Sequence, residues 1–162
     1  VYHGERSAEN DYAGPSLEYP IAARDMMMQT TIEHRRSIDY LSSRSEIDTT
    51  RIGMLGLSMG GLITFQLTSI DSRIKTAIAG LTPQINDSRY QPVASSTFAS
   101  HVDCNSFLMF MGNKDDWYTM KEARQLYDLI PVTQKEFVEY NTGHEPPAEY
   151  VEKVTNWFLK YL

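Results

Sequence analysis

Cysteine is almost absent from this sequence, with Cys104 as its single copy among 162 residues. One cysteine permits neither a disulfide within the chain nor a cysteine-based zinc site, and a free thiol fits a reducing compartment. The sequence shows no signal peptide, and no apolar run approaches the roughly 18 residues that a membrane-spanning helix needs. We therefore expect a cytoplasmic protein that does not insert into a membrane.

Positive charge is also scarce. Fifteen Lys and Arg residues face 21 Asp and Glu residues, which leaves a net charge of -6. This balance argues against a nucleic-acid partner and leaves no basic patch for anionic lipid. The four histidines lack metal-ligand spacing, and the glycines form neither a dinucleotide fingerprint nor a phosphate-binding loop. We expect a small-molecule partner and neither metal nor cofactor.

Strand-like and helix-like segments alternate along the chain. This alternation predicts a single α/β domain over residues 1–162, with a mostly parallel sheet and helices on both faces. Strands are expected at 51–57, 74–81, 106–112 and 135–140, and helices at 19–43, 62–70, 120–130 and 147–161. Residues 1–18 are predicted to form a loop, and residues 82–105, rich in Pro, Ser, Asn and Asp, a short connection over the site.

A serine between glycines follows the first predicted strand, in the stretch "GLSMGG" over residues 56–61. A tight strand-to-helix turn would lift Ser58 clear of the sheet as a nucleophile, and Gly56 and Gly60 would relieve the crowding around it. Such a turn would also aim the N–H of Met59 at a developing oxyanion. The alternative is an ordinary serine N-cap in a glycine-rich turn.

An acid and a histidine follow the serine, each just after a later strand. Asp115 and Asp116 come after the third predicted strand, and His144 comes after the fourth. The carboxyl ends of parallel strands share one edge of a sheet, so these residues are expected beside Ser58 in the crevice where such sheets bind ligands. The chain order serine, acid, histidine is that of a hydrolase triad.

Other polar and aromatic residues lie near these segments. Trp117 and Tyr118 stand beside the acid and are candidates for substrate binding, although such residues more often serve packing. His101 and Asp103 fall in the predicted connection, where local hydrogen bonds are the expected role. His34 is expected on the solvated side of the first helix.

Taken together, these segments resemble the α/β-hydrolase superfamily, especially its dienelactone-hydrolase-like and prolyl-oligopeptidase-like esterase branches. The resemblance rests on "DTTRIGMLGLSMGG", "RIKTAIAG", "FLMFMGNKDDWYTMKEARQLY" and "KEFVEYNTGHEPPAEYVEKVTNWFLKYL". It implies Ser58 as the nucleophile and His144 as the base. It favours Asp115 over Asp116 as the acid, and it makes the Met59 N–H one oxyanion donor. The implied activity is cleavage of carboxylic esters through an acyl-enzyme intermediate.

The resemblance also implies strands that these 162 residues do not contain. The segment "YHGERS" resembles the one that follows the fourth strand of such enzymes, so the earlier strands and the second oxyanion N–H would lie elsewhere. The apolar run 51–57 would then have an open edge, which is a hazard in water. Three explanations are open. The chain is part of a larger hydrolase, which is the favoured one, or another chain supplies the missing strands, or two copies cover the edge by forming a homo-oligomer.

Two functions from different classes therefore remain open. The first is a serine esterase, and the second is a catalytically incomplete fragment that serves only folding or interaction. Residues 82–105 are too few for a large lid, which disfavours bulky lipid substrates, and the acyl group is not determined. Hydrolysis of a simple chromogenic ester separates the two functions.

Overall fold

Four parallel strands form the sheet of this protein, in the order β1-β2-β3-β4. The computed structural model describes residues 19–162 except residue 83, so the predictions for residues 1–18 and "YHGERS" lie outside the described residues. The strands are β1 Ile52–Leu57, β2 Ile74–Gly80, β3 Ser106–Gly112 and β4 Gln134–Tyr140. The helices are α1 Pro20–Ser42, α2 Met59–Ile70, η2 Ser88–Val93, α3 Ser95–Ala99, α4 Met120–Asp128 and α5 Tyr150–Tyr161.

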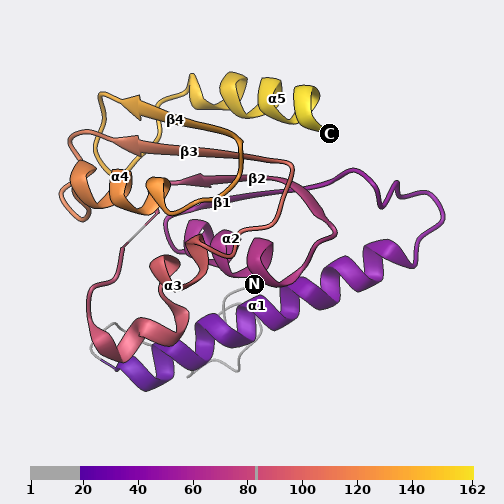
Figure 1. Cartoon of the computed structure of the whole chain (residues 1–162), viewed down its shortest axis with the longest axis horizontal. Helices are drawn as coiled ribbons and strands as arrows, with labels where there is room; N and C mark the ends of the chain where they lie inside the picture. Colours follow the sequence, from indigo (N-terminus) through magenta and orange to yellow (C-terminus); the bar gives the residue numbers. More distant parts are fainter. Residues whose placement is uncertain (1–18, 83) are drawn as a thin grey trace, which may run out of the picture.

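Helices cover both faces of this sheet, which confirms the predicted fold class (Figure 1). On one face, the Trp157 indole of α5 donates a hydrogen bond to the Thr76 hydroxyl of β2 over 3.0 Å. On the other face, Phe65 of α2 packs against Phe107 of β3, with 5.1 Å between the ring centroids. These two contacts lie on opposite faces of the sheet. Thr76 pairs with Ser106, and Phe107 is the next residue of β3, so its side chain points to the other face.

The third strand forms the centre of the core. Every residue of β3 is buried, and β3 lies between β2 and β4, as its unbroken apolar sequence predicts. The predicted connection over residues 82–105 is more ordered than expected, since it contains η2 and α3. It packs along α1 and α2, where the Gln66 amide donates to the Val93 carbonyl over 2.8 Å.

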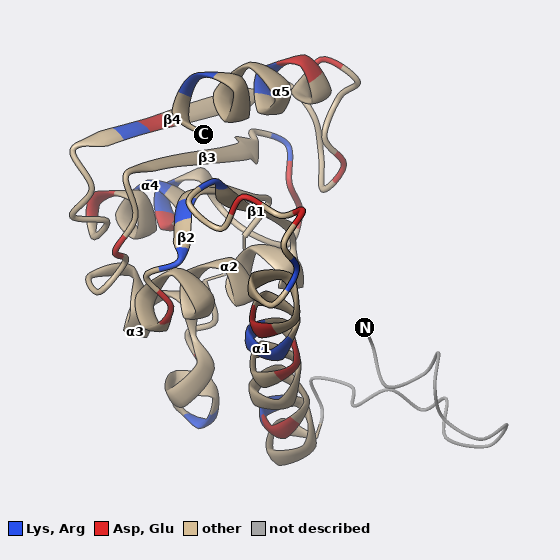
Figure 2. Cartoon of the chain, turned by 90° about the vertical axis from the view of Figure 1, so that its right-hand side faces the viewer, with Lys and Arg blue, Asp and Glu red and all other residues tan. Residues whose placement is uncertain are grey.

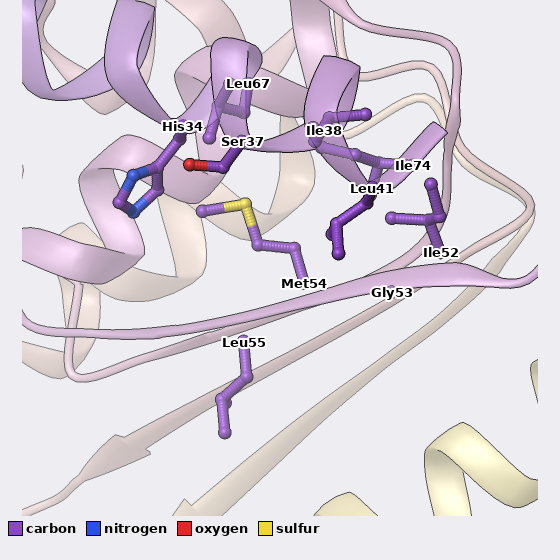
Figure 3. Close-up of a pocket in the computed structure, with 10 residues that line it drawn as sticks. All are labelled: His34, Ser37, Ile38, Leu41, Ile52, Gly53, Met54, Leu55, Leu67 and Ile74. Carbon is purple, nitrogen blue, oxygen red and sulfur yellow. The ribbon is translucent and has the colours of Figure 1, made fainter. Parts of the chain in front are cut away.

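The first strand differs from its prediction. Its sequence is apolar on both faces, yet only Gly56 of its six residues is buried, and Leu55 is 40% exposed. Within residues 19–82 and 84–162, β1 pairs with β2 and with no other strand. Figure 3 shows Met54 turned toward α1 and Leu55 turned the other way. The expectation that something beyond the described residues covers this edge stays a prediction.

A hollow of about 330 Å³ lies beside β1, between this strand and α1 (Figure 3). Ten residues line it: His34, Ser37, Ile38, Leu41, Ile52, Gly53, Met54, Leu55, Leu67 and Ile74. Most of these side chains are apolar, as in the rest of the α1–α2 contact. The hollow opens to the surface at the free edge of β1, because Ser37, Leu41, Gly53 and Leu55 in its lining are exposed.

The first helix carries the charge pattern of a surface helix. Figure 2 shows acidic and basic residues side by side along α1, rather than a patch of either sign. Its other side buries Ala23, Met27 and Ile38 against α2 and η2. In the described part of the chain, no helix combines the length and apolarity needed to cross a membrane. The cytoplasmic location stays a prediction.

Candidate active site

Ser58 occupies the turn between β1 and α2 in a conformation that few non-glycine residues adopt. Its φ is 54° and its ψ is -118°, and its N–H donates to the Gly80 carbonyl over 2.8 Å. Such a backbone costs about 1–3 kcal/mol and persists only where the surroundings hold it. The sharp turn raises the Ser58 side chain above the carboxyl edge of the sheet, as predicted.

The glycines around this serine are not equivalent. A Cβ at Gly56 would collide with the carbonyl group of Gly60, so only glycine fits at position 56. Apart from its chain neighbours and the backbone of its own helix, no described atom lies within 4 Å of a Cβ placed on Gly60, so the prediction that Gly60 also relieves crowding is wrong. The carbonyl of Gly60 faces Gly56, whereas a Cβ at Gly60 would point into open space. The sequence pattern does not distinguish the two glycines.

The hydroxyl of Ser58 lies within hydrogen-bond distance of His144. The Ser58 Oγ is 2.9 Å from His144 Nε2, and His144 Nδ1 is 2.7 Å from Asp115 Oδ2. By position Ser58 is the N-cap of α2, but its side chain makes no cap hydrogen bond to the described helix. The Ser58 side chain therefore does not cap the described helix as an ordinary N-cap would, and its role as a nucleophile stays a prediction.

Asp115 rather than Asp116 makes the contact with the histidine. The Asp115 side chain is fully buried, whereas Asp116 is exposed. Asp115 Oδ1 accepts hydrogen bonds from the N–H groups of Trp117 (2.8 Å) and Tyr118 (3.2 Å), which leaves Oδ2 for His144. A carboxylate can only accept, so His144 Nδ1 carries the proton and Nε2 is free to accept from Ser58.

The loops that carry the acid and the histidine are bonded to each other. The N–H of Asn113 donates to the Tyr140 carbonyl over 2.8 Å, and that of Lys114 to the Thr142 carbonyl over 2.9 Å. A Cβ at Gly112 would collide with the carbonyl of Thr142 and that of the next residue. Glycine at position 112 therefore allows the two loops to approach.

Two aromatic rings pack against the histidine. The Trp117 indole is stacked on the His144 imidazole, with 5.0 Å between centroids and 9° between planes. The Tyr118 ring meets the imidazole edge-on at 5.7 Å. Burial, and to a lesser extent the charge of Asp115, raises the pKa of Tyr118. Both residues lie at the site, but their expected contact with substrate stays a prediction.

Met59 is the first residue of α2, directly after the serine. The first N–H groups of a helix have no partner within the helix and face the positive end of its dipole. The N–H of Met59 is therefore available to an anion beside Ser58. Its role as an oxyanion donor stays a prediction, as does the second donor.

The remaining candidates lie away from this cluster. The exposed His101 lies 3.2 Å from the Ser100 hydroxyl, so its expected local hydrogen bond is confirmed. The backbone N–H of Asp103 donates to the Thr68 carbonyl over 3.0 Å. His34 is half-buried beside β1 and burial lowers its pKa, so the expectation of a solvated position is wrong. His34 is partly buried because this face of α1 turns toward the hollow beside β1.

Sequence reasoning missed one feature that supports the acid loop. Thr119 and Glu122 form a capping box, in which the Thr119 hydroxyl accepts from the Glu122 N–H over 3.2 Å. The Glu122 carboxylate in turn accepts from the Thr119 N–H over 3.0 Å. This box starts α4 at Met120, five residues after Asp115, and so ends the loop. The signal was present as "TMKE", the Ser/Thr-x-x-Glu pattern of a helix start.

No metal centre accompanies these residues in the described part of the chain. Over residues 19–82 and 84–162, no three His, Cys, Asp or Glu side chains are grouped so that they could hold a metal ion. The single cysteine, Cys104, is partly buried, and burial raises the pKa of its thiol to about 12. A thiol of that pKa is a poor nucleophile at neutral pH.

Comparison with known proteins places the cluster in a family context. The family model described as "BAAT / Acyl-CoA thioester hydrolase C terminal" matches residues 34–146, a range that includes Ser58, Asp115 and His144. A short stretch is similar to a Bacillus subtilis (strain 168) protein, YtaP, whose name describes it as a hydrolase. The two are 43% identical over 42 residues, which is 26% of this chain and 14% of YtaP.

Solved structures share the fold at low sequence identity. A cold-adapted esterase from an Arctic intertidal metagenomic library superposes with a TM-score of 0.77 at 18% identity, over 96% of this chain and 65% of that one. An acetyl xylan esterase from Paenibacillus sp. R4 gives 0.73 at 20% identity, over 83% and 52%. This chain thus spans between half and two thirds of the length of these structures.

Proposed function

The chain belongs to the BAAT / acyl-CoA thioester hydrolase C-terminal family, and from this membership we propose that it is a serine hydrolase that cleaves carboxylic esters. The observation that carries the proposal is the hydrogen-bonded series from Ser58 through His144 to Asp115. A serine hydroxyl is a weak nucleophile unless a base takes its proton, and the histidine is within reach of that proton.

In the proposed first step, Ser58 Oγ attacks the carbonyl carbon of the ester. The Ser58 proton passes to His144 Nε2 over a starting separation of 2.9 Å. The buried Asp115 carboxylate stabilises the imidazolium that forms and keeps the ring oriented. The N–H of Met59 stabilises the negative oxygen of the tetrahedral intermediate. The intermediate collapses as His144 gives its proton to the leaving alcohol, and the acyl group stays on Ser58.

In the proposed second step, water replaces the alcohol. His144 Nε2 takes a proton from the water molecule as its oxygen attacks the acyl carbon. Collapse of the second tetrahedral intermediate returns the proton to Ser58 Oγ and releases the carboxylic acid. The enzyme is restored, and one water has been consumed for each ester cleaved.

A thioester is the second candidate substrate, because the family model carries the name of acyl-CoA thioester hydrolases. The same attack by Ser58 would apply. A thiolate is a much better leaving group than an alkoxide, so thioester cleavage needs less proton donation from His144. Loss of general acid catalysis should therefore impair ester cleavage more than thioester cleavage.

We also propose that further polypeptide completes the sheet beside β1. The unpaired side of β1 and the 40% exposure of Leu55 support this, as does the greater length of the structural relatives. The added segment comes from the same protein or from a second copy, and it would supply the second oxyanion N–H. Without that segment, Ser58, Asp115 and His144 are still in place but the oxyanion hole lacks its second donor, and the chain is then the catalytically incomplete fragment.

Hydrolysis of p-nitrophenyl acetate and of acetylthiocholine by the purified chain tests these proposals. We expect ester cleavage that Ser58→Ala abolishes. Labelling by a fluorophosphonate, read as a mass increase on the peptide with Ser58, tests the nucleophile without assuming an acyl group. Labelling without turnover of either substrate would support the incomplete fragment. Retention of most activity in Ser58→Ala would exclude the proposed nucleophile.

A further inference from the structure

Trp117 keeps its indole against the catalytic imidazole although most of its surface is in water. The residue is 69% exposed, yet its ring plane lies within 9° of the His144 ring plane. Tyr118 meets the same imidazole edge-on, with 61° between the planes. The Trp117 and Tyr118 rings also meet each other, with 6.5 Å between their centroids, so the three rings form one triangular cluster.

The Asp115 turn creates this arrangement. One carboxylate oxygen of Asp115 accepts from the N–H groups of Trp117 and Tyr118, and the other accepts from His144 Nδ1. The same carboxylate therefore fixes both the backbone of Trp117 and the orientation of the His144 ring. The turn that holds the acid therefore places the Trp117 backbone beside the histidine, and from there the indole lies on the imidazole.

We propose that Trp117 is a positioning residue that acts through His144. Its indole face fixes the plane of the imidazole and stabilises the imidazolium that forms when Ser58 loses its proton. The attraction between a cation and an indole face is the physical basis, and tryptophan is the best aromatic partner for it. This inference rests on the proposed function of the triad.

A change at Trp117 leaves the other groups that face His144 chemically unaltered. The Asp115 carboxylate and the Tyr118 phenol face His144 from the loop after β3, and the Ser58 hydroxyl faces it from the β1–α2 turn. Lys114 and Asp116 flank Asp115 in the same loop, and Glu145 is the next residue of its own loop. A difference between Trp117 variants therefore reports the indole.

Tryptophan fluorescence tests the stack without any substrate. A protonated imidazole stacked on an indole quenches its emission, and a neutral imidazole does so much less. The chain has two tryptophans, and the second, Trp157, is 5% exposed and bonded to Thr76. Trp117→Phe therefore supplies the background emission.

We expect the Trp117 emission, taken as wild type minus Trp117→Phe, to fall in one step as the pH is lowered from 8 to 5. His144→Gln should remove that step. A step that persists in His144→Gln, or no step in the wild type, would overturn the proposal. This result does not depend on catalysis, so it distinguishes failure of the stack from failure of the proposed hydrolase function.

Kinetics of p-nitrophenyl acetate hydrolysis test the consequence. Trp117→Leu should lower kcat/KM about two- to thirtyfold, with kcat falling and KM nearly unchanged. The pH at which kcat/KM reaches half its plateau should also fall, because the imidazolium is less stable without the indole. Trp117→Phe should lie between the two, and Asp116→Asn, an exposed neighbour, should match the wild type. A rise in KM with unchanged kcat and pH profile would instead make Trp117 a substrate contact and overturn the proposal.

Discussion

The N–H of Lys114 donates a hydrogen bond to the carbonyl oxygen of Thr142 over 2.9 Å. One of these residues precedes Asp115 and the other lies two residues before His144, so the bond joins the acid loop to the histidine loop. The parallel pairing of β3 with β4 continues through this bond beyond the last pair of the sheet, Gly112 with Tyr140. The separation of the acid and the histidine is thus determined by backbone, and not by the side chains alone.

Gly112→Ala should disturb this junction. The added Cβ would collide with the Thr142 carbonyl, and a carbonyl of the backbone cannot move aside as a flexible side chain can. We expect a loss of about 1–3 kcal/mol in the free energy of unfolding and a clear fall in kcat. Urea denaturation and ester hydrolysis measure the two effects.

Gly60→Ala is the matched control for stability. Its Cβ would have open space among the described residues, and the position lies in the first turn of α2. The free energy of unfolding of this variant should equal or exceed that of the wild type, since alanine favours a helix more than glycine does. Equal stability losses in both variants would contradict the role given to Gly112.

Asp115→Asn should impair catalysis far more than Asp116→Asn. An amide at position 115 can donate to His144 Nδ1, which would favour the tautomer that cannot accept the Ser58 proton. In a serine-protease triad, the same change costs about four orders of magnitude in kcat. Asp116 is exposed and should tolerate the change with little effect. The kcat values of the two variants with p-nitrophenyl acetate test this prediction. A larger loss of kcat in Asp116→Asn would make Asp116 the acid of the triad instead.

Ser58→Gly and Ser58→Ala separate the strain of the turn from the chemistry of the hydroxyl. Both variants lack the nucleophile and should be inactive. Glycine adopts a φ of 54° without the penalty that a Cβ brings, so Ser58→Gly should be more stable than Ser58→Ala by about 1 kcal/mol. Thermal unfolding of the two inactive proteins measures this difference. A more stable Ser58→Ala would show that the turn is not strained.

The sheet and the three residues of the proposed triad could be predicted because each has a local signal. Asp115 follows β3, a buried strand that reads as a continuous apolar run, and His144 follows β4, a strand of mixed polar and apolar sequence. Their meeting then follows from topology, since all carboxyl ends share one edge. The choice of Asp115 over Asp116 needed family resemblance as well.

Other features could not be predicted, because they depend on contacts between distant segments. The close approach at Gly112 involves carbonyls of a loop 30 residues later in the chain. Nothing in a single sequence distinguishes this glycine from Gly60, whose Cβ position is open. The Trp117 stack likewise follows from the hydrogen bonds of Asp115, and the exposure of β1 depends on which strands lie beside it.

Asp71 should make stability depend on pH in acid. Its side chain is 4% exposed and accepts from the Arg73 guanidinium over 2.8 and 2.6 Å, and these bonds lower the pKa of Asp71. A carboxyl whose pKa is lower in the folded state stabilises fully above its unfolded pKa near 4, and that contribution is lost as the pH falls below it.

Asp71→Asn tests this dependence. At pH 7 the variant should lose about 1–3 kcal/mol in the free energy of unfolding, because two hydrogen bonds from a charged donor are weakened. The difference from the wild type should shrink as the pH is lowered from 4 toward 2, since the wild-type carboxyl then protonates as well. Chemical denaturation at several pH values measures it. A difference that is constant between pH 2 and pH 7 would rule out the ion pair as its cause.

Hydrogen exchange along β1 should reveal whether further polypeptide covers its free edge. In a parallel strand, successive N–H groups point to opposite sides, so about half of those in Ile52–Leu57 face β2 and the rest face away from it. An unpaired edge exchanges within seconds, while a paired one is protected by the stability of the sheet. We expect every second amide of β1 to be as well protected as its neighbours, whereas the outward amides of β4 exchange fast.

Two mass measurements then identify the source of the covering segment. A longer chain raises the intact mass of the polypeptide, whereas a second copy raises only the molar mass in solution. Rapid exchange at alternate amides of β1, in a monomer of the mass of these 162 residues, would contradict a covered edge.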